Sequence, residues 1–193
     1  MKRTFLSASV VCFVVVACSD PPPPTSRAII ESTVNAVGVN SKHTQKDCPG
    51  IAAIQWLNMG GFGNPSTGTL PRAVENNSSE GGGTAVINCS VKKAGDKYDV
   101  AASAQITGGS GGNIAITGRF TESGEQAGIR GVFTRGDFGR FEQTDCKVTY
   151  GEAPQGIAAG RIWGNLSCPD IKGSDGLKVC NAEVQFRFEN CAQ

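Results

Sequence analysis

Apolar and polar residues alternate along the chain from residue 84 to residue 188. Near the end of this stretch, Ala182, Val184 and Phe186 alternate with charged or polar residues. The same pattern recurs in about seven segments, which are 84–91, 98–106, 113–120, 128–135, 140–150, 157–166 and 179–188. A period of two gives a strand one buried face and one solvent-facing face. The pattern therefore predicts about seven β-strands.

Short turns join these segments. The intervals 94–96, 108–112, 124–126 and 136–137 are rich in glycine, and the chain has 26 glycines in all. Tight turns of this kind join antiparallel neighbours, because parallel strands need long crossover connections. We expect an all-β fold, an antiparallel sandwich or a partly closed barrel, with residues 84–193 forming a β meander.

Residues 28–83 have a less regular pattern. The segment 28–37 fits a strand or a short helix, the segment 51–59 fits either, and the segment 60–83 is typical of a loop. Together with the meander they have a length suited to one domain, residues 28–193.

The amino terminus has the features of an export signal. Lys2 and Arg3 precede an apolar run that ends at Val16, which is shorter than the roughly 20 residues of a membrane-spanning helix. The end of this run and the two residues after it, Val15-Val16-Ala17-Cys18, resemble the lipobox of bacterial lipoproteins. The resemblance implies that residues 1–17 are a signal peptide and that Cys18 carries a diacylglycerol, which anchors the chain in a lipid bilayer.

Residues 18–27 then form the expected anchor and spacer. The run Pro21–Pro24 favours the extended polyproline conformation, which holds a domain away from the headgroup layer. In the sorting rule of enteric bacteria, Ser19 after the lipidated cysteine does not signal retention in the inner membrane. We therefore expect a lipid-anchored protein of the cell envelope, at the outer membrane.

Apart from Cys12 in the signal segment and Cys18, the chain has six cysteines, which indicate a disulfide-stapled domain. Export leads to an oxidising compartment, and an even number of cysteines there favours three disulfides. A metal site is the less favoured alternative, because the chain has no Cys-x-x-Cys pair and one histidine. Sequence alone does not choose the pairing, but Cys168 and Cys180 flank an expected hairpin loop, which favours pairing them. The remaining expected pairs are Cys48 with Cys89 and Cys146 with Cys191.

Charge and motifs provide little support for catalysis or for nucleic-acid binding. The chain has 18 basic and 17 acidic side chains, so no strong field attracts nucleic acid. The loop 63–69 has the glycine spacing of a phosphate loop without its lysine. His43, in a polar stretch, is the one candidate for a histidine base. No cofactor is expected.

Carboxylates are the remaining catalytic option. Asp137, Glu142 and Asp145 lie close together in sequence, and glycosidic chemistry needs two acids that face one cleft. Glu142 and Asp145 are three residues apart, so a regular strand directs them to opposite faces. We expect solvent-facing charges here and a protein that is not an enzyme.

Trp163 is the most conspicuous aromatic residue of the carboxyl-terminal half. We expect it in the core or packed against a disulfide, with Arg161 as a residue that could stack on it. The alternative is that Trp163 marks a binding face, for which Trp56, Tyr98 and Tyr150 are the other aromatic candidates. The sequence around it, 160–164, followed by Cys168-Pro169, Cys180 and the segment 186–191, is similar to the tail of cysteine-rich lipoproteins of myxobacterial type. The resemblance carries no known activity.

These observations predict a membrane-anchored extracytoplasmic lipoprotein with a structural or binding role at the cell envelope. Its expected partners are the bilayer, through acylated Cys18, and an envelope protein or ligand. A small-ligand carrier and a carboxylate-dependent secreted hydrolase are the alternatives.

Replacing the lipidated thiol tests the anchor. We expect Cys18→Ser to move the protein from the membrane fraction to the soluble fraction, because the substituted chain has no sulfur to acylate. Fractionation followed by immunoblotting measures the shift. Continued sedimentation with membranes would contradict the lipoprotein assignment.

Overall fold

A computed structural model describes residues 23–36, 48, 54–108, 111–176 and 178–193. Cys18, His43 and the segment 1–17 lie outside the described residues, so the predictions about them stay predictions. Within the described residues, no helix has the length and apolar character needed to cross a bilayer.

The described chain is all-β, which confirms the predicted fold class. The strands are β1 (Arg27–Ala36), β2 (Ile54–Met59), β3 (Val74–Glu75), β4 (Ser79–Glu80), β5 (Gly83–Ala94), β6 (Lys97–Thr107), β7 (Gly112–Phe120), β8 (Gln126–Arg135), β9 (Gly139–Thr149), β10 (Gly156–Ala158), β11 (Arg161–Gly173) and β12 (Val179–Glu189). A single 3-10 turn, Pro65–Thr67, is described between β2 and β3. Each of the seven predicted segments contains a strand, but the segment 157–166 is divided at Gly160, whose positive φ of 74° turns the chain from β10 into β11.

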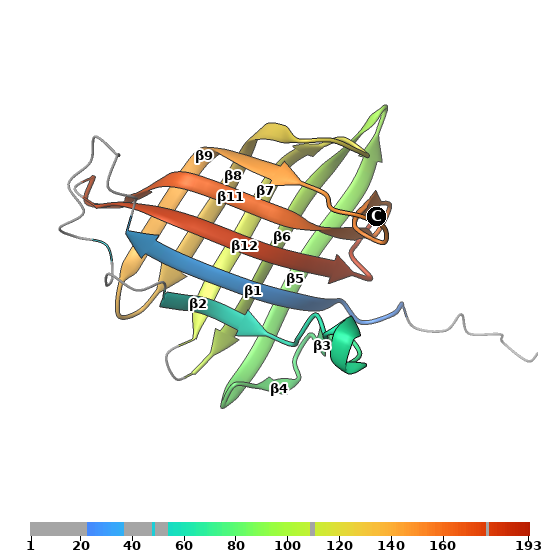
Figure 1. Ribbon diagram of the computed structural model, residues 1–193, viewed down its shortest axis with the longest axis horizontal. Helices are drawn as coiled ribbons and strands as arrows, with labels where there is room; N and C mark the ends of the chain where they lie inside the picture. Colours follow the sequence, from blue (N-terminus) through green and yellow to red (C-terminus); the bar gives the residue numbers. More distant parts are fainter. Residues whose placement is uncertain (1–22, 37–47, 49–53, 109–110, 177) are drawn as a thin grey trace, which may run out of the picture.

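One antiparallel sheet contains all of these strands and curls into a barrel rather than splitting into a sandwich (Figure 1). The hydrogen-bonded order is β2-β1-β12-β11-β9-β8-β7-β6-β5-β4. From β5 to β9 each strand pairs with its neighbour in sequence, so this part is the predicted meander. The first described strand, β1, lies against the last one, β12, which brings Arg27 beside Glu189.

A short segment, residues 74–80, closes the barrel between β1 and β5. Its first part, β3, pairs with β1, and its second part, β4, pairs with β5. Between them, the Asn76 amide donates to the Ser26 carbonyl at 2.9 Å, and the Asn76 side-chain oxygen accepts from the Ile87 amide at 2.8 Å. The segment therefore satisfies backbone groups on both edges of the seam.

The carboxyl terminus closes the same seam further along β5. The Ala192 amide donates to the Cys89 carbonyl, and the Val91 amide donates to the Ala192 carbonyl, both at 2.9 Å. A disulfide joins Cys89 to Cys191 beside these bonds. The last residues of the chain thus act as a covalently fixed strip between β12 and β5.

The interior of the barrel is filled with side chains. The inward face of β6 carries Val100, Ala102 and Ala104, as the alternation predicts. Six large aromatic side chains that are at most 1% exposed belong to the core: Trp56, Phe120, Phe133, Phe141, Phe186 and Phe188. Close packing of this kind leaves the barrel a solid core rather than a container.

The six cysteines of the domain form three disulfides, which confirms their predicted oxidation but not their pairing. The bonds join Cys48 to Cys180, Cys89 to Cys191 and Cys146 to Cys168. All three expected pairs, Cys168 with Cys180, Cys48 with Cys89 and Cys146 with Cys191, are wrong.

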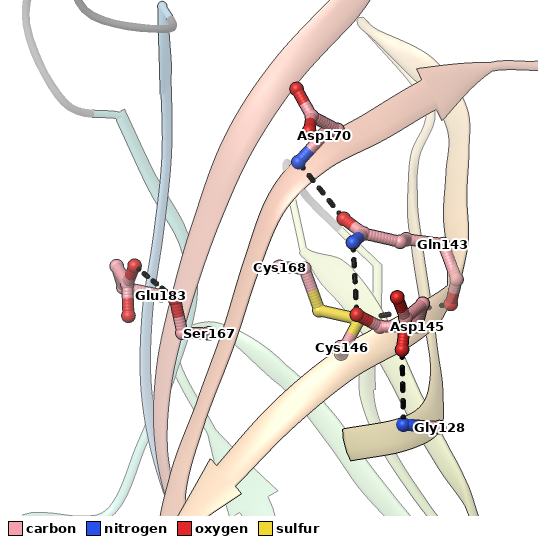
Figure 2. Close-up of a disulfide and its surroundings, with 8 residues drawn as sticks. All are labelled: Gly128, Gln143, Asp145, Cys146, Ser167, Cys168, Asp170 and Glu183. Atoms are coloured by element: carbon pink, nitrogen blue, oxygen red, sulfur yellow. Dashed lines mark hydrogen bonds between the residues drawn. A yellow bond between two sulfur atoms is a disulfide. The ribbon is translucent and has the colours of Figure 1, made fainter.

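The reason is the length of β11, which continues beyond Cys168 to Gly173. The turn into β12 therefore comes later than expected, and the register places Cys168 opposite Ala182 rather than opposite Cys180. On the other side of β11, Ser167 pairs with Lys147, so Cys168 lies across from Cys146 of β9 (Figure 2). A cross-strand disulfide with a Cα–Cα distance of 4.5 Å joins them.

Removal of the disulfide at the seam should cost more stability than removal of the disulfide within the sheet. The Cys89–Cys191 bond spans 102 residues and the Cys146–Cys168 bond spans 22. Because a longer closed loop restricts the unfolded chain more, we expect Cys89→Ala with Cys191→Ala to lower the free energy of unfolding by about 1 kcal/mol more than Cys146→Ala with Cys168→Ala. Urea unfolding followed by circular dichroism measures both. Equal losses, or a larger loss for the pair within the sheet, would contradict this ranking.

Candidate functional site

The outer face of β1, β12 and β11 carries ordered rows of side chains. The register places Ile29, Arg187 and Trp163 in one row across the three strands. Ile29 is fully buried although it points away from the barrel core. A buried apolar residue on the outer face means that another part of the chain covers this region of the sheet.

Trp163 lies in this covered region, stacked between strand and loop residues. The Arg187 guanidinium carbon is 4.9 Å from the centre of the Trp163 ring, a cation–π distance. The Phe62 ring stacks on Trp163 with centroids 5.9 Å apart and an interplanar angle of 22°. The prediction that Trp163 lies in the core or against a disulfide is therefore wrong, and the arginine that stacks on it is Arg187 rather than Arg161.

The segment that covers Trp163 is the roof loop, defined as residues 62–71. Backbone hydrogen bonds between Asn64 and Thr69 hold it in a hairpin, and the Asn64 side chain accepts from the Ser66 amide at 3.0 Å. A side chain at Gly63, where φ is +77°, would meet the Thr69 carbonyl oxygen at 2.4 Å, so this close approach requires glycine.

The base of the roof loop is fixed by a pair of charged residues. Arg72 donates two hydrogen bonds to the Glu80 carboxylate at 2.7 and 3.0 Å, and Glu80 also accepts from the Gly60 amide at 3.0 Å. The hydrogen bond from Arg72 holds the pKa of Glu80 below its ordinary value. The roof loop is therefore preorganised over the sheet.

Between the roof loop and the sheet lies a cavity of about 770 Å³, which we name the Trp163 groove. Its floor is formed by outward side chains of β1, β12 and β11, and Pro154 also lines it. Leu70 stands at the rim with 82% of its surface exposed. Arg161, also exposed, lines the groove and has no ion-pair partner among the described residues. The groove thus combines apolar surface, an aromatic floor, the cation of Arg161 and one exposed carboxylate, Glu31.

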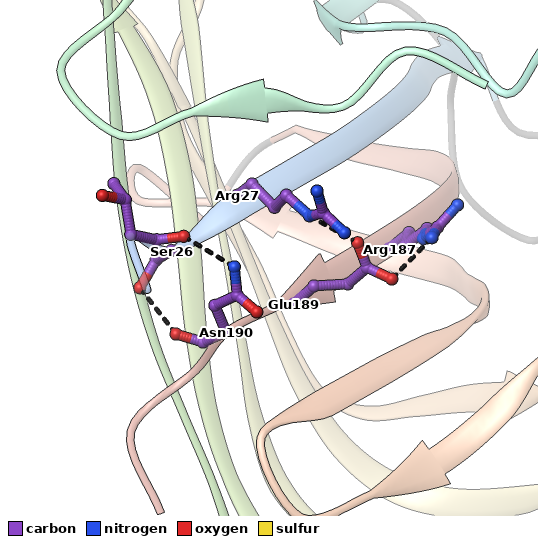
Figure 3. Close-up of polar contacts among 6 residues, drawn as sticks. Ser26, Arg27, Arg187, Glu189 and Asn190 are labelled. Atoms are coloured by element: carbon purple, nitrogen blue, oxygen red, sulfur yellow. Dashed lines mark hydrogen bonds and ion pairs between the residues drawn. The ribbon is translucent and has the colours of Figure 1, made fainter. Parts of the chain in front are cut away.

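A buried carboxylate supports the groove from one end (Figure 3). Glu189 accepts from Arg27 Nε at 2.7 Å and from Arg187 Nη2, and its side chain is 10% exposed. Burial by itself raises the pKa of Glu189, but the hydrogen bond from Arg187 and the charges of Arg187 and Arg27 outweigh burial and hold that pKa below its ordinary value. Glu189 is therefore ionised at neutral pH and fixes Arg187 against Trp163.

The three candidate catalytic carboxylates do not converge on the Trp163 groove. Asp137 pairs with Arg135 at 2.9 Å, and Asp145 accepts from the Gly128 amide at 3.2 Å. Glu142 pairs with Arg140 and Arg130 at 2.7 and 3.2 Å. Each carboxylate is thus held by a local partner on the surface.

The expectation that Glu142 and Asp145 are solvent-facing charges is confirmed, but they do not point to opposite faces, because β9 is not a regular strand here. Phe141 and Cys146 are both buried, although residues an odd number of positions apart on a regular strand face opposite sides. The inward–outward alternation of side chains therefore shifts between them, and both carboxylates lie on the outer surface. The cause is an interruption in the pairing of β9 with its neighbours β8 and β11. In the gap between β9 and β11, the Gln143 side chain accepts a hydrogen bond from the Asp170 amide at 2.9 Å (Figure 2).

Glu142 also lines a second cavity, of about 420 Å³, at this gap. The hydrogen bond from Arg140 holds the pKa of Glu142 below its ordinary value. A general acid of a glycosidase needs the opposite shift, a raised pKa. Glu142 is therefore held as the ionised partner of Arg140 and Arg130.

The sequence contained one signal for the Trp163 groove. Ile162, Leu166 and Cys168 occupy alternate positions of β11 and point inward. Trp163, at a position between them, therefore points to the outer face. The long-range contact with Phe62 had no comparable signal, because the roof loop lies about a hundred residues earlier in the chain and its path depends on how β1 pairs with β12.

Within the described residues, no group of three or more histidine, cysteine, aspartate or glutamate side chains is placed to hold a metal ion. Comparisons of the chain with protein-family models, with curated proteins and with solved structures found no match.

Acidification should weaken the fold through Glu189. A carboxyl whose pKa is lowered by folding contributes stability above its unfolded pKa and loses that contribution as the pH falls through its folded pKa. We expect Glu189→Gln to reduce the free energy of unfolding by about 1–2 kcal/mol at neutral pH, with the difference from the unsubstituted protein shrinking as the pH falls below the ordinary pKa of a glutamate. Urea unfolding at a series of pH values measures it.

Glu183→Gln is the matched control, because Glu183 is an exposed residue on the same strand and face. We expect a smaller loss for this variant. A Glu189→Gln deficit that does not change with pH would contradict the assigned ionisation.

Proposed function

We propose that the chain is an exported lipoprotein, anchored in a bilayer through Cys18, and that its barrel is a rigid platform with a binding site on its outer wall. The observation that carries the proposal is the preorganised Trp163 groove on the outside of a barrel whose interior is filled. The signal-like segment and the lipobox support the anchor, and the three disulfides suit an oxidising compartment outside the cytoplasm.

The groove suits a ligand with an apolar or planar part and an anionic group. Leu70 and Phe62 offer apolar surface, and Arg161 offers hydrogen-bond donors to an anion. Glu189 fixes Arg187 against Trp163, which keeps the floor of the groove rigid. A ligand that enters the groove therefore costs little side-chain conformational entropy.

The alternative of a carrier with an internal cavity has less support. A carrier barrel encloses its ligand, whereas large aromatic side chains such as Phe133 and Phe186 occupy this core. The alternative of a carboxylate-dependent hydrolase also has less support, because Asp137, Glu142 and Asp145 are each held by a separate local partner and do not converge on the Trp163 groove.

A fluorescent probe of matching chemistry tests the groove. Anilinonaphthalene sulfonate has an aromatic system and one anionic group, so we expect it to bind the folded Cys18→Ser protein with increased fluorescence. Arg161→Ala should weaken binding by about tenfold, because it removes a charge-assisted hydrogen-bond donor. Fluorescence titration measures the dissociation constant.

Arg119→Ala is the control, because Arg119 is an exposed arginine on β7, away from the groove. Its dissociation constant should not change. Equal weakening by both substitutions would show a non-specific charge effect, and binding that is insensitive to Arg161→Ala would place the probe elsewhere. Either result would contradict the groove as the binding site.

A further inference from the structure

The amino-terminal spacer leaves the barrel beside the Trp163 groove. Pro23 and Pro24 line a cavity together with Arg161, and Arg161 also lines the groove. Hydrogen bonds from Ser26 Oγ to the Asn190 carbonyl at 3.1 Å and from the Asn190 side chain to the Thr25 carbonyl at 2.9 Å fix this exit point (Figure 3). The direction from which the anchor pulls on the barrel is therefore defined.

The roof loop lies at the same end of the barrel. Val74 pairs with Ala28 at the start of β1, and the backbone bonds between Gly61 and Arg72 hold the loop just before it. Figure 1 shows the 3-10 turn of this loop beside the first residues of β1, and the turn between β11 and β12 at the opposite end. The end near the spacer thus carries the exposed Leu70, and the far end carries the polar Ser174.

The length of the spacer limits the distance between this end and a lipid anchor. Cys18 precedes Pro23 by five residues. Because a fully extended chain spans at most about 3.6 Å per residue, an acylated Cys18 lies within about 18 Å of Pro23. The point of anchoring is therefore closer to the groove and the roof loop than to the turn at the far end.

We infer that the roof loop docks on the bilayer that holds the anchor, with Leu70 at the boundary between headgroups and acyl chains and Arg161 at the level of the lipid phosphates. This inference rests on the proposed lipidation of Cys18 and adds the orientation of the barrel and the partner of the groove. Among the described residues, Leu70 is the large hydrophobic side chain that is exposed to solvent. Contact with a membrane surface would bury this side chain.

The net charge at the end of the barrel that carries the roof loop is compatible with a membrane of mixed lipid composition. Four arginines at this end face three carboxylates, which leaves an excess of one positive charge: the arginines are Arg27, Arg72, Arg161 and Arg187, and the carboxylates are Glu31, Glu80 and Glu189. The contact therefore needs no strongly anionic membrane. A tethered domain meets the surface at high effective concentration, so a small apolar contact is enough to orient it.

Depth-dependent quenching tests the inference. Lipidated protein with Leu70→Trp is reconstituted into phosphatidylcholine vesicles whose acyl chains carry bromine, a quencher of tryptophan fluorescence at short range. We expect the added tryptophan to lose about half of its emission, because an interfacial side chain lies within reach of the bromines. Ser174→Trp is the matched control at the far end and should not be quenched.

Flotation of the vesicles separates the two proposals. If the protein floats and Leu70→Trp is not quenched, or both reporters are quenched alike, the orientation inferred here is wrong while the lipid anchor stands. If the protein does not float, the anchor is absent and both proposals fail. Emission from Trp56 and Trp163 is subtracted by measuring the unsubstituted protein under the same conditions.

Discussion

The fold depends on how the seam between β5 and the opposite edge of the sheet, formed by β2 and the start of β1, is closed. Neither edge pairs directly with the other along its length, and unpaired edge groups are costly when buried and prone to aggregation when exposed. Two short segments solve the problem: residues 74–80 pair with both edges, and the carboxyl-terminal residues bond to β5 beside the Cys89–Cys191 disulfide. The spacer exit, the roof loop and the Glu189 ion pairs all lie along this closure.

Closure at this seam also decides where binding takes place. A sheet curled into a barrel of this size brings its inward side chains into contact, and aromatic residues such as Phe133 fill the space. The outer wall then remains for recognition. There the register of β1, β12 and β11 aligns Arg187 with Trp163, and the roof loop, which enters the sheet through β3, covers them. The groove is thus a consequence of the same pairings that close the barrel.

Alternation predicted the strands from residue 84 onward, because one face of each is buried and the other is wet. Alternation did not predict the secondary structure of residues 28–83, because Ile29 is buried on the outer face and β3 and β4 are only two residues long. Nor did it give the disulfide pairing, since the partner of Cys168 depends on how far β11 extends and on which strand lies on its other side. Non-local register, which sequence patterns do not carry, determined both the pairing and the Trp163 groove.

The most direct test of an anchored, disulfide-stapled barrel is the intact mass of the native protein extracted from membranes, measured before and after reduction. The account predicts a chain that begins at Cys18 with added acyl mass, and a gain on reduction of two hydrogens for each of the three disulfides. A chain that begins elsewhere without acyl mass would contradict the anchor. A smaller gain on reduction would contradict the covalent closure of the barrel.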